Sequence, residues 1–254
     1  MKTRSRSQNY FLKHVCRWVI KDCNLNLLGE YFVVGLGCGH ETLSRHLEDP
    51  VNVSGLAKTI EVFTGFYKGV RVSTIAIPGG GVYTEWIVRI AALKPVKAII
   101  GVGFCGALRE DIEIGDIIIP TASARDEDTT DHYVSKKMPA ISDFFIISTL
   151  TKHAMSKSLK FYVGPTITTS ASLKEDDKFI AEWVGCKVLG VDCETSILYL
   201  LSHLYNIGAG AILVVSDHLI KRISYSISKE YEKRVQKAFN DVIIVALDTI
   251  ADIS

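Results

Sequence analysis

Six apolar, β-branched runs recur along this chain, and several of them lack strict alternation of apolar and polar residues. Strands of that kind are buried on both faces, so helices must cover a mixed or parallel sheet on either side. The intervening segments carry apolar residues at helical spacing. The pattern predicts one three-layer α/β/α domain. The expected strands are residues 31–34, 70–77, 96–102, 114–119, 161–168 and 211–215, and the expected helices are residues 83–93, 142–156, 193–205 and 228–250.

Cap signals and charge support this division of the chain. Ser142-Asp143 and Ser228 are expected to cap the second and fourth helices, and Gly208 to end the third in a left-handed conformation. Residues 1–21 contain six basic residues and no acid. We expect residues 1–29 to form a basic N-terminal arm that docks on its own domain or a neighbour, with a transit segment as the alternative. Residues 30–254 then form a single domain.

Composition excludes several classes of function. The chain has 254 residues and a formal net charge of +1, so no nucleic-acid-binding stripe dominates its surface. Its apolar runs are too short to span a membrane. The six cysteines form no C-x-x-C pair and resemble neither a disulfide framework nor a zinc site, which predicts a reducing, cytoplasmic setting and no metal. A small-molecule enzyme is the default expectation.

Two acidic segments indicate where the chemistry lies. Val214-Val215-Ser216-Asp217-His218 ends an apolar strand, and Val191-Asp192-Cys193-Glu194 precedes it, opening the third helix. Strand ends of this kind line the ligand crevice of open α/β folds. Two carboxylates there suit proton donation and hydrogen bonding to hydroxyls. As alternatives, Asp217 caps a helix or pairs with a cation, and Asp192 and Glu194 are first-turn helix charges.

Glycine clusters follow two early strands, as Gly35-x-Gly37-x-Gly39 and Gly79-Gly80-Gly81. Their backbone N–H groups can approach an anion, although tight strand-to-helix turns explain them as well. The first cluster misses the dinucleotide fingerprint because its third glycine comes one position early, so a nicotinamide oxidoreductase is a distant alternative.

Taken together, four motifs make the chain resemble the nucleoside phosphorylase-I superfamily. They are Gly101-Val102-Gly103-Phe104-Cys105-Gly106-Ala107-Leu108, Ile114-Gly115-Asp116-Ile117-Ile118-Ile119-Pro120, Gly190-Val191-Asp192-Cys193-Glu194-Thr195 and Val214-Val215-Ser216-Asp217-His218. Phe63-Thr64-Gly65-Phe66-Tyr67-Lys68-Gly69 is similar to the family's early hairpin. The resemblance covers residues 30–250 and implies an α/β/α fold around a mixed, partly barrel-like sheet. It also implies a homo-oligomer, either a dimer or a hexamer.

The resemblance implies a role for each matched residue. Asp217 takes the place of the acid that protonates or hydrogen-bonds N7 of a departing purine, which requires a raised pKa. Glu194 matches the glutamate that holds the ribose hydroxyls, and Cys193 replaces a methionine packed on the sugar. Asp192 completes the acidic motif and provides electrostatic stabilisation. The substrate-binding set expected from the family is Asp192, Cys193, Glu194, Ser216, Gly103 and Phe104.

The family's phosphate-binding side chains are absent. No arginine stands in the first glycine loop, and Gly101 and Phe104 replace an arginine and a hydroxyl residue of the third glycine turn. Because a phosphate dianion needs charge-assisted donors, either other groups substitute or water attacks instead. The candidate phosphate-binding residues are Gly35, Gly79, Gly80, Arg45 and Arg125, and Lys221 and Arg222 are further possible substitutes. Phosphate enters as a co-substrate, and no other cofactor is expected.

Two loops bear on the substrate. Residues 121–133 are similar to a segment of AMP nucleosidases, with a solvated acidic loop as the alternative. Residues 168–177 lack the Gln-x-Arg motif of uridine phosphorylases, which favours a purine. The leading hypothesis is phosphorolysis of a purine nucleoside to free base and ribose 1-phosphate. Hydrolysis of a nucleoside or AMP is the alternative, and a non-catalytic nucleoside-binding homologue is the second. His218 is expected to be a structural histidine.

Overall fold

A single mixed sheet organises the computed structural model, which describes residues 6–37 and 41–254. Within that part the strand order is β11-β10-β6-β8-β9-β5-β1-β4-β3-β2, and β7 pairs with β6. Because β10 also pairs with β5, the strands β10, β6, β8, β9 and β5 close into a barrel. The strands are β1 (Tyr31–Leu36), β2 (Glu48–Asn52), β3 (Glu61–Tyr67), β4 (Val70–Ile77), β5 (Ala98–Ala107), β6 (Ile117–Asp126), β7 (Ala140–Ile141), β8 (Phe161–Thr169), β9 (Gly190–Asp192), β10 (Gly208–His218) and β11 (Ile223–Ser224).

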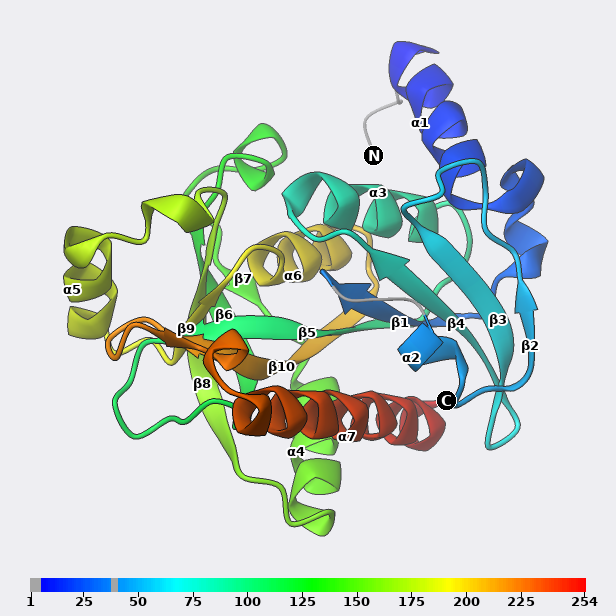
Figure 1. The fold of residues 1–254 in the computed structure, drawn as a ribbon. Helices are drawn as coiled ribbons and strands as arrows, with labels where there is room; N and C mark the ends of the chain where they lie inside the picture. Colours follow the sequence, from blue (N-terminus) through cyan, green and yellow to red (C-terminus); the bar gives the residue numbers. More distant parts are fainter. Residues whose placement is uncertain (1–5, 38–40) are drawn as a thin grey trace.

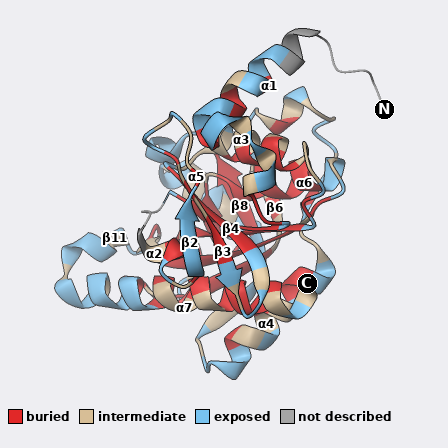
Figure 2. Ribbon diagram, turned by 90° about the vertical axis from the view of Figure 1, so that its right-hand side faces the viewer, coloured by how far each residue is buried: buried red, intermediate tan, exposed pale blue. Residues whose placement is uncertain are grey.

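Helices cover both faces of this sheet, as predicted (Figure 1). In Figure 2 the buried residues concentrate in the sheet and on the helix sides turned toward it. One core joins α1, α3 and α6 to the sheet, and a second joins α4 and α7 to its other face. Among the described residues, no helix is both long and apolar enough to cross a membrane. The helices are α1 (Arg6–Val19), α2 (Glu41–Ser44), α3 (Gly81–Ala91), α4 (Phe144–Ser156), α5 (Asp177–Gly185), α6 (Thr195–Leu204) and α7 (Lys229–Ile253).

Local signals explain most element boundaries. Asp143 caps α4 by accepting hydrogen bonds from the N–H groups of the second and third residues after it, and Ser228 caps α7 similarly. Both caps were predicted. The prediction that Gly208 ends the third helix is wrong, because Asn206 adopts the left-handed conformation there, at φ 57°. Gly208 instead begins β10, where its pairing with Ala98 of β5 extends the strand.

The N-terminal arm contributes to the main core. Trp18 of α1 contacts Trp86 of α3 with ring centroids 5.7 Å apart, and Val15 and Val19 are buried in the same cluster as α3. Backbone hydrogen bonds join Val19 to the loop before β3 through Gly55. The helix therefore docks on its own domain.

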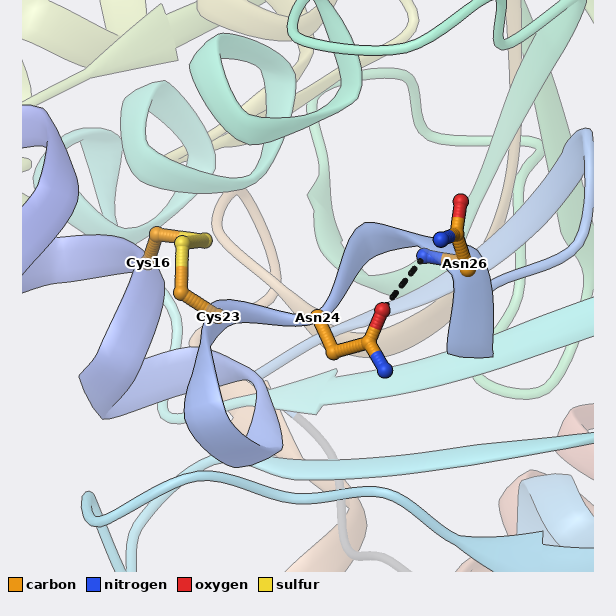
Figure 3. Close-up of a disulfide and its surroundings, with 4 residues drawn as sticks. All are labelled: Cys16, Cys23, Asn24 and Asn26. Carbon is orange, nitrogen blue, oxygen red and sulfur yellow. Dashed lines mark hydrogen bonds between the residues drawn. A yellow bond between two sulfur atoms is a disulfide. The ribbon is translucent and has the colours of Figure 1, made fainter.

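A disulfide joins two of the cysteines, whose pattern was expected not to resemble a disulfide framework. Cys16, in α1, and Cys23, in the short 3₁₀ helix Lys21–Cys23, are bonded with Cα atoms 5.1 Å apart (Figure 3). Asn24 follows, and its side chain accepts a hydrogen bond from the Asn26 N–H. The sequence spacing does not predict the bond, because the turn after α1 brings the two residues together.

Packing of this arm requires a glycine at position 55. A Cβ atom there would lie 2.4 Å from the Arg17 carbonyl oxygen and 2.5 Å from that of Trp18, and neither backbone atom can move without displacing α1. We expect Gly55→Ala to lower the free energy of unfolding by about 2–4 kcal/mol in urea titration. Gly185→Ala is the control, because nothing lies within 4 Å of its added Cβ. Equal stability of both variants would contradict this account.

Candidate active site

Glu194 lies where two glycine turns meet at the carboxyl ends of β1 and β4. A Cβ atom on Gly79 would lie 3.1 Å from the Gly37 Cα and 3.2 Å from Glu194 Oε1, so this approach requires glycine. Glu194 accepts hydrogen bonds from the N–H groups of Gly80 and Cys193, the latter at 3.2 Å. Burial and the neighbouring Asp192 raise the pKa of Glu194 to about 7. The carboxyl group is therefore near its titration point at neutral pH.

Asp192 anchors the start of α6. Its Oδ1 accepts a hydrogen bond from the Thr168 hydroxyl at 2.6 Å and from the N–H groups of Glu194 and Thr195 at 3.4 and 3.3 Å, while the Thr195 hydroxyl donates to Oδ2. Burial raises the pKa of Asp192, and these hydrogen bonds oppose that shift. The alternative of a first-turn helix charge is wrong for Asp192, because this residue ends β9 and α6 begins only at Thr195. By accepting the hydrogen bond from the Glu194 N–H, Asp192 positions the backbone of Glu194.

A buried polar network extends from this point to residues 121–133. The Thr168 hydroxyl accepts from the Ser196 N–H at 2.9 Å, and the Ser196 hydroxyl donates to Glu127 Oε1 at 3.0 Å. Glu127 in turn accepts from the Thr130 N–H at 3.0 Å and from its hydroxyl. The side chains of Arg125 and Glu127 are 6% and 1% exposed. The alternative of a solvated acidic loop is therefore wrong for these two side chains.

Asp217 lies inside β10, so the alternative of a helix N-cap is wrong. The register of β10 against β5 shifts between Val215 and Asp217, which places Asp217 opposite Gly106. A Cβ on Gly106 would lie 2.7 Å from Asp217 Oδ2, so the glycine provides space for the carboxyl group. The Ser216 hydroxyl donates to Asp217 Oδ1 at 2.8 Å. Burial raises the pKa of Asp217, as a proton donor requires.

Glu175 is a further acid of this region, and the sequence analysis did not single it out. It follows the 3₁₀ helix Ser172–Lys174 and is half-buried, whereas its neighbours on both sides are exposed. Burial and the charge of Asp217 raise the pKa of Glu175 to about 7. The charge of Glu175 in turn contributes to the raised pKa of the Cys193 thiol. Three adjacent acids, at positions 175–177, gave no sequence signal of which one turns inward.

Cys193 is unsuited to nucleophilic attack. Burial, followed by the carboxylates of Glu194, Asp192 and Glu175, raises the pKa of its thiol to about 12. The thiolate, which is the reactive form, is therefore scarce at neutral pH. A packing role fits this thiol.

Gly103 and Phe104 lie at the same edge of the sheet. A Cβ on Gly103 would lie 2.8 Å from the Leu36 carbonyl oxygen, so β1 and β5 approach closely there. Phe104 stacks on Phe239 of α7 with centroids 4.8 Å apart. The predicted substrate-binding residues thus come from β5, β9, β10 and the start of α6.

The predicted phosphate-binding residues are not all gathered in one place. Gly35 lies within β1, between Ala76 and Val102, and not in the turn that follows. Gly79 and Gly80 adjoin Glu194, as described above. Arg125 donates hydrogen bonds to Thr130, Ser135, Met138 and Asp131. Its guanidinium is therefore engaged in hydrogen bonds within the protein. Arg45 extends from the end of α2 toward α7. Gly39 lies outside the described residues.

The remaining basic candidates are engaged in surface pairs. Lys221 Nζ donates to Glu113 Oε1 at 2.8 Å, and Arg222 pairs with Asp177 of α5. His218 is buried, its Nδ1 accepts from the Lys221 N–H at 3.3 Å, and burial lowers its pKa. Its buried Nε2 has no hydrogen-bond partner among the described residues, so a structural role for His218 stays a prediction.

A family model described as the phosphorylase superfamily matches residues 32–251. The chain belongs to that family, and the barrel-containing sheet with its acidic strand ends carries the motifs of the resemblance.

Individual relatives support this assignment. The chain is 31% identical over 212 residues to a DeoD-type purine nucleoside phosphorylase of Buchnera aphidicola, covering 81% of this chain and 86% of the relative. It is 28% identical over 146 residues to a guanosine phosphorylase of Halorubrum lacusprofundi, covering 58% and 59%. The fold is similar to that of uridine phosphorylase from Vibrio fischeri ES114, with a TM-score of 0.84, 22% identity and coverage of 96% and 99%.

Glu175 should influence the titration of Asp217. Removing a like charge lowers the pKa of a neighbouring acid, so Glu175→Gln is expected to move the alkaline limb of the pH–rate profile to lower pH, by up to about one unit. The measurement is kcat between pH 5 and 9. Glu182→Gln, on the exposed side of α5, serves as the control and should leave the profile unchanged. Coincident profiles for Glu175→Gln and the wild type would show that the two carboxyl groups are independent.

Proposed function

We propose that this chain cleaves the N-glycosidic bond of a purine nucleoside by phosphorolysis, giving free base and ribose 1-phosphate. The observation that carries the proposal is the placement of two acids on neighbouring strand ends: Asp217 of β10 lies beside Gly106 of β5, and Glu194 lies at the glycine turns that follow β1 and β4. The names of the Buchnera and Halorubrum relatives support a purine.

The two acids have different roles in this reaction. The C1′–N9 bond breaks, its electron pair moves onto the base, and Asp217 donates a proton to N7. Phosphate oxygen forms the new bond to C1′. Glu194 accepts hydrogen bonds from the ribose hydroxyls. Its negative charge and that of Asp192 stabilise the positive charge that develops on the sugar. The raised pKa of Asp217 keeps a proton available for transfer.

A hydrolytic nucleosidase is the second candidate, favoured by Gly101 and Phe104 where the family carries phosphate-binding side chains. Product release with and without phosphate separates the two. Ribose 1-phosphate formed only with phosphate supports phosphorolysis, and free ribose released without phosphate supports hydrolysis. Absence of turnover with a panel of purine nucleosides would support the non-catalytic alternative.

Location and assembly complete the proposal. We place the enzyme in the cytoplasm, in nucleoside salvage, where reducing systems would hold Cys16 and Cys23 as a dithiol. Alkylation of freshly extracted protein followed by mass spectrometry tests whether Cys16 and Cys23 are reduced.

We also propose a homo-oligomer, supported by the exposed rings of Phe144 and Phe145 on α4, each 75% exposed. Sedimentation velocity gives the subunit number.

A further inference from the structure

A basic cavity of about 470 Å³ opens between α2 and α7. In Figure 2 the short α2 lies next to α7. Among the side chains that the structure describes, those that line the cavity are three cations, two neutral hydrogen-bonding groups and one ring. They are Thr42, Arg45, Lys233, Gln236, Lys237 and Phe239.

The three cations converge without neutralising partners in the described part of the chain. Lys233 and Lys237 stand one turn apart on α7 and repel each other unless an anion lies between them. Arg45 approaches from α2, and its guanidinium donates to the neutral Asn240 Oδ1 at 2.5 Å. That oxygen also lies 3.1 Å from His46 Nε2. Arg45 is therefore oriented without losing its charge.

The cavity adjoins the candidate active site through one aromatic pair. Phe239 lines the cavity and stacks on Phe104, which directly follows Gly103 in β5. Gly103 packs on the Leu36 backbone at the end of β1, and the next residue, Gly37, approaches the turn that contacts Glu194. One aromatic pair thus connects the lining of the cavity to the end of β5 that carries Gly103 and Phe104.

We propose that this cavity binds a phosphoryl group through Arg45, Lys233 and Lys237, with Thr42 and Gln236 as neutral donors. Charge-assisted donors around a doubly negative group give the strong contacts that backbone N–H groups alone do not provide. The group comes either from inorganic phosphate or from the 5′-phosphate of a nucleotide. The inference deepens the proposed function and rests on it for the identity of the reaction.

Binding measured without turnover tests the proposal. The double variant Lys233→Gln/Lys237→Gln is compared with Lys229→Gln, an exposed lysine of the same helix that does not line the cavity. The ligands are inorganic phosphate, guanosine and guanosine 5′-monophosphate, titrated by calorimetry. Removing two cations is expected to weaken the binding of the phosphoryl ligand by about tenfold or more, while the affinity for guanosine stays unchanged. All the exchanged side chains are exposed, so unchanged thermal unfolding verifies that the variants fold.

The outcomes separate the two sources. Weaker inorganic phosphate binding identifies the co-substrate, and a loss confined to the monophosphate identifies the 5′-phosphate of a nucleotide. Unchanged affinities for both ligands overturn the proposal, as does an equal loss in Lys229→Gln, which would indicate a general surface charge effect. Phosphate-independent ribose release would remove the proposed phosphorolysis without affecting these binding results, so the two failures are distinguishable.

Discussion

Asp217→Asn is expected to lower kcat by about 10²–10⁴-fold, the range for loss of a positioned proton donor. Asparagine has nearly the same shape, and its Oδ1 can accept the Ser216 hydroxyl that now donates to the carboxyl group. The space provided by Gly106 also remains. The loss should therefore appear in kcat with little change in unfolding temperature.

Steady-state kinetics with saturating nucleoside and phosphate measure this effect. Asp111→Asn is the matched control, because Asp111 lies in an exposed pair with Arg109, and such pairs contribute little to stability. A nucleoside whose base is already a good leaving group should lose less rate in Asp217→Asn than a natural purine nucleoside. Unaltered kcat with the natural substrate would exclude Asp217 as the acid.

Glu194→Gln is expected to lower kcat/KM by about 10²-fold, since it weakens the hydrogen bonds to the ribose and removes the charge that opposes the sugar cation. Glutamine retains an oxygen that can accept from the Gly80 N–H, so the glycine turn keeps its support. Activity and stability should therefore respond differently to this substitution.

Stability provides the second readout. The pKa of Glu194 is raised from 4.5 to about 7 in the folded protein, so its favourable contribution is complete below about pH 4.5 and disappears as pH rises through about 7. Wild-type unfolding free energy should fall across this window by a few kcal/mol, and Glu194→Gln should flatten the fall. Urea titrations at pH 5 and pH 8 measure it. Steeper pH dependence in the variant would refute the assignment.

The fold follows largely from periodicity. The runs expected at residues 70–77 and 161–168 match β4 and β8 to within one residue, because apolar β-branched runs have few other stable environments. The strand β2 escaped prediction because all five of its residues are exposed, so no apolar run marks it. The three-residue β9 is similarly too short to show a period.

Site geometry was less accessible to prediction. Asp217 and Glu194 were identifiable because each belongs to a local motif at a strand or helix boundary. Glu127 belongs to the segment that is similar to AMP nucleosidases, but its burial was not predictable, and Glu175 was not identified. The environments of these two acids depend on contacts with α6 and with Asp217, far away in the chain. Arg125 illustrates the reverse difficulty, because it was a candidate to replace the missing phosphate-binding arginines, whereas its hydrogen bonds are internal.

By itself the sequence determined the class of fold, the family motifs and the two principal acids, because periodicity and short motifs depend on neighbouring residues. Only the tertiary structure decided how these parts meet. Closure of the barrel through β10 and β5 places Asp217 against Gly106, and the turn after α1 joins Cys16 to Cys23. Packing of α2 on α7 likewise brings Arg45 to Lys233, and long-range contacts of this kind leave no periodic signal in the chain.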